Sequence, residues 1–328
     1  SASAARQRIS RAPTDKVRRL SGLIFPNNVR FLYHEKHFDT PNYWDALIRD
    51  IDQSNSAYRP AIAALQARQG VIPLHHFSIA SGSPIKQRGQ VSSATVLERL
   101  EAVGLVRRDT LPDIGEVVIL KTHDDLAPVF YPLLIARLTV ENILLSALRD
   151  WARRLGIASY GKVAIRGQDN LPKFGTFHWD LSGPSYMAPL VTRTQGKAPK
   201  PGFLVCDVIA GSTLSKDAVT PFIRKFTLSR ALKGLPPFLP ILLADGYENE
   251  AFNEGRSQGL MLATPSALFG KDVAAGLEAL LDTMGKAAAV ATKRPESIGL
   301  IFDKLGAIEG AAGNLRGALF ELVVGHVT

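Results

Sequence analysis

The sequence predicts a multi-domain α/β protein, and three observations lead to this prediction. The chain has 328 residues, which corresponds to roughly two domains at about 150 residues each. An apolar fraction of 46% with 21% charged residues is typical of a globular chain and excludes a wholly disordered or collagen-like one. Residues 41–121 have the pattern of helices followed by two short strands, and from residue 122 helices and strands alternate.

The cysteine content and the hydropathy pattern bear on the compartment. The single cysteine, Cys206, excludes an internal disulfide framework and a zinc site built from several cysteines, and it suits a reducing cytoplasm. The most apolar stretch, residues 126–140, is too short for a membrane span and contains Pro132 and Arg137. The N-terminus is basic and lacks the apolar segment of a secretory signal. We therefore expect a cytoplasmic protein that does not enter a membrane.

The net charge of +9 is concentrated near the N-terminus. Residues 1–30 contain seven Lys and Arg residues against Asp15 alone, whereas residues 31–121 have no net charge. A basic segment of this kind is a common electrostatic handle for nucleic acid, although a solvated leader would have the same composition. Residues 1–38 are predicted to be a basic arm on double-stranded DNA, with these contacts: Arg6, Arg8, Arg11, Arg18 and Arg19.

Two helices are predicted after the arm. Residues 41–55 form an amphipathic pattern in which apolar side chains recur at spacings of three and four, with Asp39 or Thr40 as the cap. Residues 56–70 form a second helical stretch that ends at a glycine. Residues 71–90 are mixed and contain a turn.

The clearest local signal in the first third is residues 91–109. Ser92 or Ser93 can cap a helix with a buried apolar stripe, and Gly104 ends that helix. A strand begins directly afterwards, and a turn-rich loop leads to a second strand over residues 117–121.

The segment SSATVLERLEAVGLVRR (92–108) resembles the third helix and first wing strand of the winged helix-turn-helix family. The resemblance covers residues 41–121, so residues 39–121 are predicted to be one such domain. In that family the start of the recognition helix enters the major groove. The resemblance thus implies DNA contacts at Lys86, Arg88, Ser92, Ser93 and Thr95. Acidic residues in the presumed wing oppose phosphate contact, so a module for protein contacts or homodimerisation is the alternative.

The second region alternates helix and strand. Its predicted helices are residues 139–156, 215–232 and 248–259, and its predicted strands are residues 162–167, 176–182, 202–211, 238–246 and 260–265. Pro221 is expected to bend the second helix or to mark a late start. This order predicts an α/β sandwich around a mixed central sheet.

Residues 238–270 resemble the closing half of the restriction-endonuclease-like fold, the PD-(D/E)xK superfamily. The resemblance spans about residues 139–270, and residues 122–270 are the predicted domain. The superfamily's site combines an Asp at the second strand, an acid-x-Lys on the third strand and often a Glu from the first helix. Clustered carboxylates there hold Mg²⁺, and the lysine orients water and stabilises developing phosphate charge.

Carried over by residue, the resemblance implies Asp180 in FHWD as the second-strand acid and Asp207 in LVCDVI as the third-strand acid. Glu141 corresponds to the first-helix acid. Ile209 stands where the lysine belongs, and Lys225 on the next helix is the implied substitute. These four residues are the predicted catalytic set, with Asp180 and Asp207 as metal ligands.

Each of these residues also has a structural interpretation. Asp180 could be a turn residue, Glu141 a first-turn helix acid and Lys225 part of a solvated helix face. Asp207 has apolar neighbours and therefore needs a partner, a proton or a metal.

The sequence therefore predicts a DNA-binding protein with a degenerate restriction-endonuclease-like domain, in a setting such as restriction, phage defence or a mobile element. An active Mg²⁺-dependent DNA endonuclease is the alternative, and a non-enzymatic protein-interaction or assembly scaffold is the second. Phosphate-loop and dinucleotide-binding patterns are absent from the sequence. Residues 271–328 are predicted to be a helical tail. Its segment 314–327, with Glu321, resembles the opening helix of a further endonuclease-like domain, so the chain is expected to be part of a longer protein or to end in a plain helix.

Overall fold

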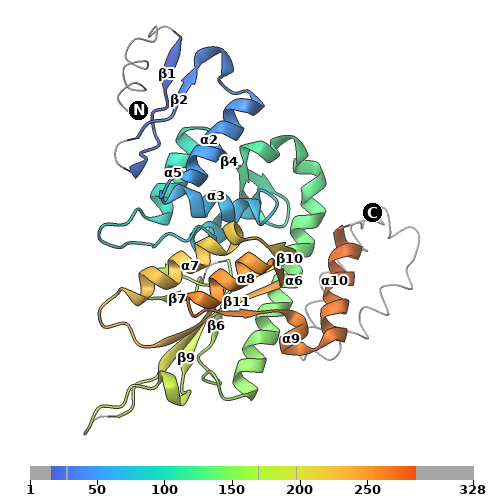
Figure 1. The fold of residues 1–328 in the computed structure, drawn as a ribbon. Helices are drawn as coiled ribbons and strands as arrows, with labels where there is room; N and C mark the ends of the chain where they lie inside the picture. The colour runs from blue at the N-terminus through green and yellow to red at the C-terminus, as the bar shows by residue number, and fades with distance from the viewer. Residues whose placement is uncertain (1–15, 27–28, 169, 197, 286–328) are drawn as a thin grey trace.

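The computed structural model describes residues 16–26, 29–168, 170–196 and 198–285, without the side chains of residues 124–131 and 283–285. The protein is a mixed α/β structure with a five-stranded mixed sheet (Figure 1). The arm residues Arg6, Arg8 and Arg11 and the predicted tail from residue 286 onward, with Glu321, lie outside the described residues. Among the described residues no helix is both long and apolar enough to cross a membrane.

The N-terminal module, residues 16–121, combines helices with a small antiparallel sheet. Its helices are α2 (Pro41–Gln53), α3 (Tyr58–Gln66), α4 (Phe77–Ala80) and α5 (Ser93–Ala102). Its sheet has the order β3 (Val71–Pro73), β5 (Gly115–Leu120) and β4 (Val106–Leu111). The two strands predicted after α5 therefore form a sheet with a third strand, β3, which pairs with β5. Strand β3 lies in residues 71–90, where the sequence predicted no strand.

Capping side chains fix where α2 and α5 begin. The hydroxyl of Thr40 accepts a hydrogen bond from the backbone N–H of Tyr43 at 3.4 Å. Asp39, the other candidate, instead accepts from the indole N–H of Trp44 at 3.0 Å. The Ser92 hydroxyl accepts from the N–H of Thr95 at 3.1 Å, so Ser92 is the cap of α5.

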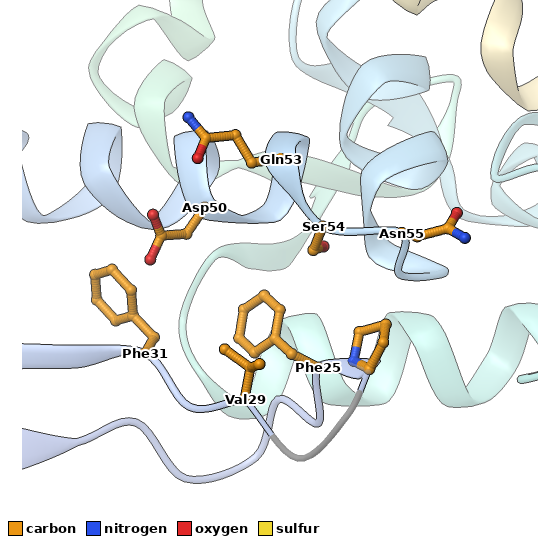
Figure 2. Close-up of a pocket in the computed structure, with 8 residues that line it drawn as sticks. Phe25, Val29, Phe31, Asp50, Gln53, Ser54 and Asn55 are labelled. Atoms are coloured by element: carbon orange, nitrogen blue, oxygen red, sulfur yellow. The ribbon is translucent and has the colours of Figure 1, made fainter. Parts of the chain in front are cut away.

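The predicted basic arm is folded from residue 17 onward. Strand β1 (Val17–Arg19) pairs antiparallel with β2 (Leu32–His34). Leu23 and Phe25 are 1% and 4% exposed in the core of the N-terminal module. Phe25 and Phe31 also line a cavity of about 410 Å³ against the end of α2 (Figure 2). Because these apolar side chains hold the segment in place, the arm is shorter than the 38 residues expected from charge.

The sheet domain, residues 122–285, contains the large sheet. Its strand order is β12 (Met261–Ala263), β11 (Phe238–Tyr247), β10 (Gly202–Leu214), β9 (Leu181–Ser185) and β6 (Ala164–Ile165). The three strands β10, β11 and β12 are parallel to one another, whereas β9 is antiparallel to both of its neighbours. A hairpin of β7 (Lys173–Phe174) and β8 (Phe177–His178) precedes β9.

Helices cover both faces of this sheet. Helices α6 (Ala127–Arg154) and α10 (Lys271–Gly285) pack on one face, and α7 (Lys216–Arg230) and α8 (Asn249–Ser257) on the other; α9 (Pro265–Phe269) follows β12. Helix α6 begins before the predicted residue 139 and contains Pro132 within it. Helix α7 begins after its cap, Ser215, and continues through Pro221.

The N-terminal module rests directly on the sheet domain, with α3 against α7 (Figure 1). Arg59 of α3 forms an ion pair with Asp217 of α7 at 2.7 Å. Arg224 of α7 donates to the carbonyl oxygen of Gly82 at 2.7 Å and to the amide oxygen of Gln90 at 2.9 Å. The segment before α5 is therefore attached to the sheet domain.

Candidate functional site

The fold brings the four predicted catalytic residues into one buried cluster. Asp180 lies immediately before β9, and Asp207 lies in the neighbouring strand β10. Glu141 comes from α6 and Lys225 from α7, on opposite faces of the sheet. All four are buried: Asp180 and Lys225 are 0% exposed, Glu141 1% and Asp207 5%.

Strand alternation explains the pairing of Asp207 with Lys225. Val205 and Ile209 point into the core beneath α7, so Asp207 between them points to the same side. The Lys225 ammonium donates to Asp207 Oδ2 at 2.6 Å and to the carbonyl oxygen of Ile79 at 3.2 Å. The same ammonium lies 4.0 Å from the centre of the Trp179 ring. A lysine on the helix after the third strand therefore reaches the third-strand acid, as the sequence suggested.

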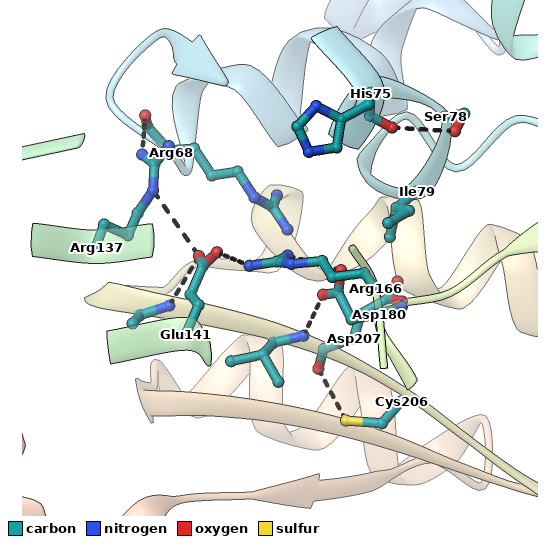
Figure 3. A network of polar contacts seen from close by, with 12 residues as sticks. Arg68, His75, Ser78, Ile79, Arg137, Glu141, Arg166, Asp180, Cys206 and Asp207 are labelled. Atoms are coloured by element: carbon teal, nitrogen blue, oxygen red, sulfur yellow. Dashed lines mark hydrogen bonds and ion pairs between the residues drawn. The ribbon is translucent and has the colours of Figure 1, made fainter. Parts of the chain in front are cut away.

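Arg166 was not predicted, and it occupies the centre of the cluster (Figure 3). Its Nη1 lies 2.7 Å from Asp180 Oδ1, and its Nη2 lies 2.5 Å from Glu141 Oε2. The residue is 8% exposed and follows the short strand β6. The sequence did contain a signal for Arg166, because it directly follows the apolar residues Ala164 and Ile165. A charged residue next to apolar ones is expected to be buried and to need a partner, as was argued for Asp207.

Backbone amides satisfy the remaining carboxylate oxygens. Asp180 Oδ2 accepts from the N–H of Val208 at 2.8 Å, and Asp207 Oδ1 from the N–H of Asp180 at 3.3 Å. Glu141 Oε1 accepts from the N–H of Ala210 at 3.4 Å. Every carboxylate oxygen of the three acids thus has a protein donor.

This donor arrangement does not fit a bound Mg²⁺ ion. A hard cation of this kind needs several carboxylate or carbonyl oxygens with free lone pairs directed at it. In this cluster the positive charge next to the acids is supplied by Arg166 and Lys225. In the part of the chain that the structure describes, no group of three or more His, Cys, Asp or Glu side chains is arranged to hold a metal ion.

Arg137, also not predicted, links the cluster to the N-terminal module. Its guanidinium donates to the carbonyl oxygens of Arg68 and Val71, the latter at 2.7 Å. Its Nε lies 3.8 Å from Glu141 Oε1. Together with the bond from Lys225 to Ile79, these contacts place module carbonyl oxygens directly over the charged side chains. The module therefore covers the cluster.

Burial perturbs the ionisation of the cluster. Burial raises the pKa of Asp207 to about 6, although the Lys225 ammonium opposes this shift. Burial lowers the pKa of Lys225 and brings the pKa of Arg137 down to about 10. For Arg166 burial also disfavours the charge, but Asp180 and Glu141 outweigh it, so the pKa of Arg166 lies above its ordinary value.

A cavity of about 640 Å³ adjoins the cluster on the side of Arg137. Its lining includes Asp245, at the end of β11, and Glu278 of α10. Asp245 Oδ2 accepts from the N–H of Gly211 at 2.7 Å. Burial raises the pKa of Asp245 to about 6, and the negative charges of Glu141 and Glu278 raise it further. This acidic lining opposes the approach of a phosphate to the cluster.

The described DNA-contact candidates lie on the N-terminal module, some in β1 and others in the loop before α5 and at the start of α5. Arg18 and Arg19 are exposed in β1, where Arg18 pairs with Glu35 at 3.1 Å. Lys86 and Arg88 are exposed in the loop before α5.

The three hydroxyl residues at the start of α5 have local roles. Ser92 caps the helix, and its hydroxyl lies 2.9 Å from that of Thr95. Ser93 is 6% exposed, and its N–H donates to the carbonyl oxygen of Pro84.

No protein-family model, no curated protein and no solved structure matches this chain. The functional assignment therefore rests on the residues and contacts described above.

Proposed function

We propose that the protein binds double-stranded DNA and that its sheet domain is a degenerate restriction-endonuclease-like domain that acts as a platform. The observation that carries the second part is the position of Arg166 between Asp180 and Glu141, at 2.7 and 2.5 Å. A fixed guanidinium supplies the positive charge that Mg²⁺ would supply in an active site of this class. The acids are thereby neutralised by the protein itself.

The topology supports both resemblances. Helix α6 precedes three antiparallel strands, β6, β9 and β10, and helix α7 leads to a parallel fourth strand, β11. This order agrees with the endonuclease-like fold expected over residues 122–270. In the N-terminal module, α4 and α5 followed by the β4–β5 hairpin agree with a winged helix.

The DNA-binding part rests on charge. The chain carries a net charge of +9, and Arg19, Lys86 and Arg88 are exposed cations of the N-terminal module. The hydroxyls of Ser92 and Thr95 contact each other at the cap of α5. We therefore propose that the described residues of this module act on DNA mainly through phosphate contacts, which confer affinity with little sequence preference.

Salt-dependent DNA binding tests this proposal. Fluorescence anisotropy with a labelled duplex should give an affinity that falls steeply as salt rises, because bound cations release counterions. Deletion of residues 1–15 should weaken binding and flatten the salt dependence. The deletion stops there because Leu23 and Phe25 belong to the core. Absence of duplex binding at low salt would contradict the proposal and favour the scaffold alternative.

Plasmid cleavage tests the degenerate site. Incubation with Mg²⁺ or Mn²⁺ should leave supercoiled DNA intact in the wild-type protein. Metal-dependent cleavage that disappears in Asp207→Asn would instead support the active endonuclease, with Asp180, Asp207 and Lys225 as its residues. Asp207→Asn preserves side-chain size and is therefore preferable to a truncation at this buried position.

A further inference from the structure

A basic surface lies at the end of the sheet domain that is remote from the buried cluster. Strands β9 and β10 are joined by a long ribbon, described at residues 186–196 and 198–201, that projects away from the body of the protein (Figure 1). Thr192 and Lys200 pair across this ribbon. Arg193 and Lys200 are exposed on it, and the sequence has no acidic residue between positions 181 and 206.

The end of α6 and the segment that follows it extend this surface. The N–H of Ser159 donates to the carbonyl oxygen of Pro184 at 2.8 Å, and the Ser185 hydroxyl donates to the carbonyl oxygen of Ile157 at 2.5 Å. These bonds hold residues 157–159 beside the base of the ribbon. Exposed side chains on this extension are Arg154, Tyr160 and Lys162, with Tyr160 82% exposed.

The acid nearest to Arg154 in the sequence is already paired. Asp150 of α6 contacts Arg149 at 3.0 Å and Arg153 at 3.5 Å. Its charge is therefore compensated by its own helix. The other cations of this end, Arg154, Lys162, Arg193 and Lys200, are exposed and form no ion pair with an acid among the residues that the structure describes.

We propose that this basic ribbon surface, formed by Arg154, Tyr160, Lys162, Tyr186, Arg193 and Lys200, binds the backbone of duplex DNA. The inference rests on the proposed DNA-binding function and assigns it a second contact region outside the N-terminal module. Exposed Lys and Arg gain affinity by displacing counterions from phosphates, and a two-stranded ribbon can lie in a DNA groove. Tyr160 and exposed Tyr186 supply hydroxyls for sugar and phosphate contacts.

The position of the surface separates it from the buried cluster. Asp180 precedes β9, whereas the ribbon follows β9 at Ser185. Five strand residues at about 3.3 Å each place the two roughly 17 Å apart. DNA held on the ribbon thus lies at the end opposite the acidic cavity lined by Asp245 and Glu278. Binding without cleavage follows from this separation.

A charge-removal pair tests the inference. Arg193→Ala/Lys200→Ala should reduce duplex affinity by about tenfold at 100 mM salt and lower the salt slope by about 2, since each phosphate contact contributes about 1. The matched control is Arg256→Ala/Lys271→Ala, which removes the same charges from exposed positions on α8 and α10. The control should bind as the wild type does. Unfolding midpoints of both variants should equal that of the wild type.

The outcomes distinguish the two proposals. Wild-type binding that is unchanged in Arg193→Ala/Lys200→Ala would overturn the ribbon surface and leave the proposed function intact. A wild-type chain that binds no duplex would overturn both. Tighter binding to single-stranded DNA that is lost in Tyr160→Ala would overturn the duplex assignment, because stacking on unpaired bases would then dominate. Binding to anionic phosphatidylserine vesicles but not to DNA would also overturn it.

Discussion

The buried cluster and the exposed ribbon of the sheet domain differ in how their charged side chains are paired. Around the middle of β10, Glu141, Asp180 and Asp207 are buried and each is paired with Arg166 or Lys225. At the other end, Arg193 and Lys200 are exposed on the ribbon. A buried charge must be matched inside the protein, whereas an exposed charge remains available to an outside partner. The difference separates residues that hold the fold together from residues suited to binding.

The contrast also changes how the predicted catalytic residues are interpreted. Their juxtaposition agrees with the expected site, but their partners are protein cations and the carbonyl oxygens of the N-terminal module. A covered network in which every carboxylate oxygen has a donor stabilises one arrangement of the N-terminal module on the sheet domain. Four predictions, from the largest expected effect to the smallest, test this contrast between the two ends.

Arg166→Met should destabilise the protein most, by about 3–5 kcal/mol, because it leaves Asp180 and Glu141 buried without a cation. Urea unfolding measured by circular dichroism gives this difference. If Mn²⁺ restored the lost stability, the acids would be able to take a metal ion once the arginine is removed. A loss below about 1 kcal/mol would contradict the central role of Arg166.

Lys225→Met should cost about 2–4 kcal/mol at pH 8, because only Asp207 loses its cation. The cost should shrink at pH 5. The pKa of Asp207 is raised from 3.8 to about 6, and it rises further without the ammonium. The folded variant therefore takes up a proton on acidification, and its stability relative to the wild type falls again as pH rises through the variant's Asp207 pKa, which lies above 6. A pH-independent cost would contradict this interpretation.

His76 tests the electrostatics beneath the N-terminal module. Burial, together with the positive charge of Arg166 and other nearby cations, holds the pKa of His76 well below 6.5. The unfolded chain binds the proton more readily, so this contribution to stability is present above pH 6.5 and is lost as pH falls. Between pH 7.5 and 5 the loss should be about 1–2 kcal/mol. His76→Gln should remove this part of the pH dependence in parallel unfolding measurements at the two pH values.

Arg154→Ala provides the exposed counterpart to Arg166→Met. The side chain faces solvent, so its removal should change the unfolding free energy by less than about 0.5 kcal/mol. Denaturant unfolding under the same conditions makes the comparison direct. A loss as large as that of Arg166→Met would show that the two ends do not differ in the way described.

Much of the local structure could be predicted from the sequence. The apolar spacing in α2 and the capping serine of α5 located these helices within a few residues. The apolar neighbours of Asp207 predicted a buried acid in need of a partner. The start of α6 was predicted too late, because the helix begins at Ala127 and continues through Pro132. The arm was predicted too long, because charge gave no sign that Leu23 and Phe25 enter the core.

By itself the sequence determined the mixed α/β class, most helices and strands of the sheet domain, and the acids and lysine that would meet in it. These properties follow from periodicity, capping and strand alternation, which are local. Only the tertiary structure decided that Arg166 would pair with two of those acids and that carbonyl oxygens of the N-terminal module would cover them. Such pairings join residues far apart in the chain, and their spacing carries no periodic signal. The exposed charge of the ribbon depends on the same packing, because packing decides which cations remain in contact with water.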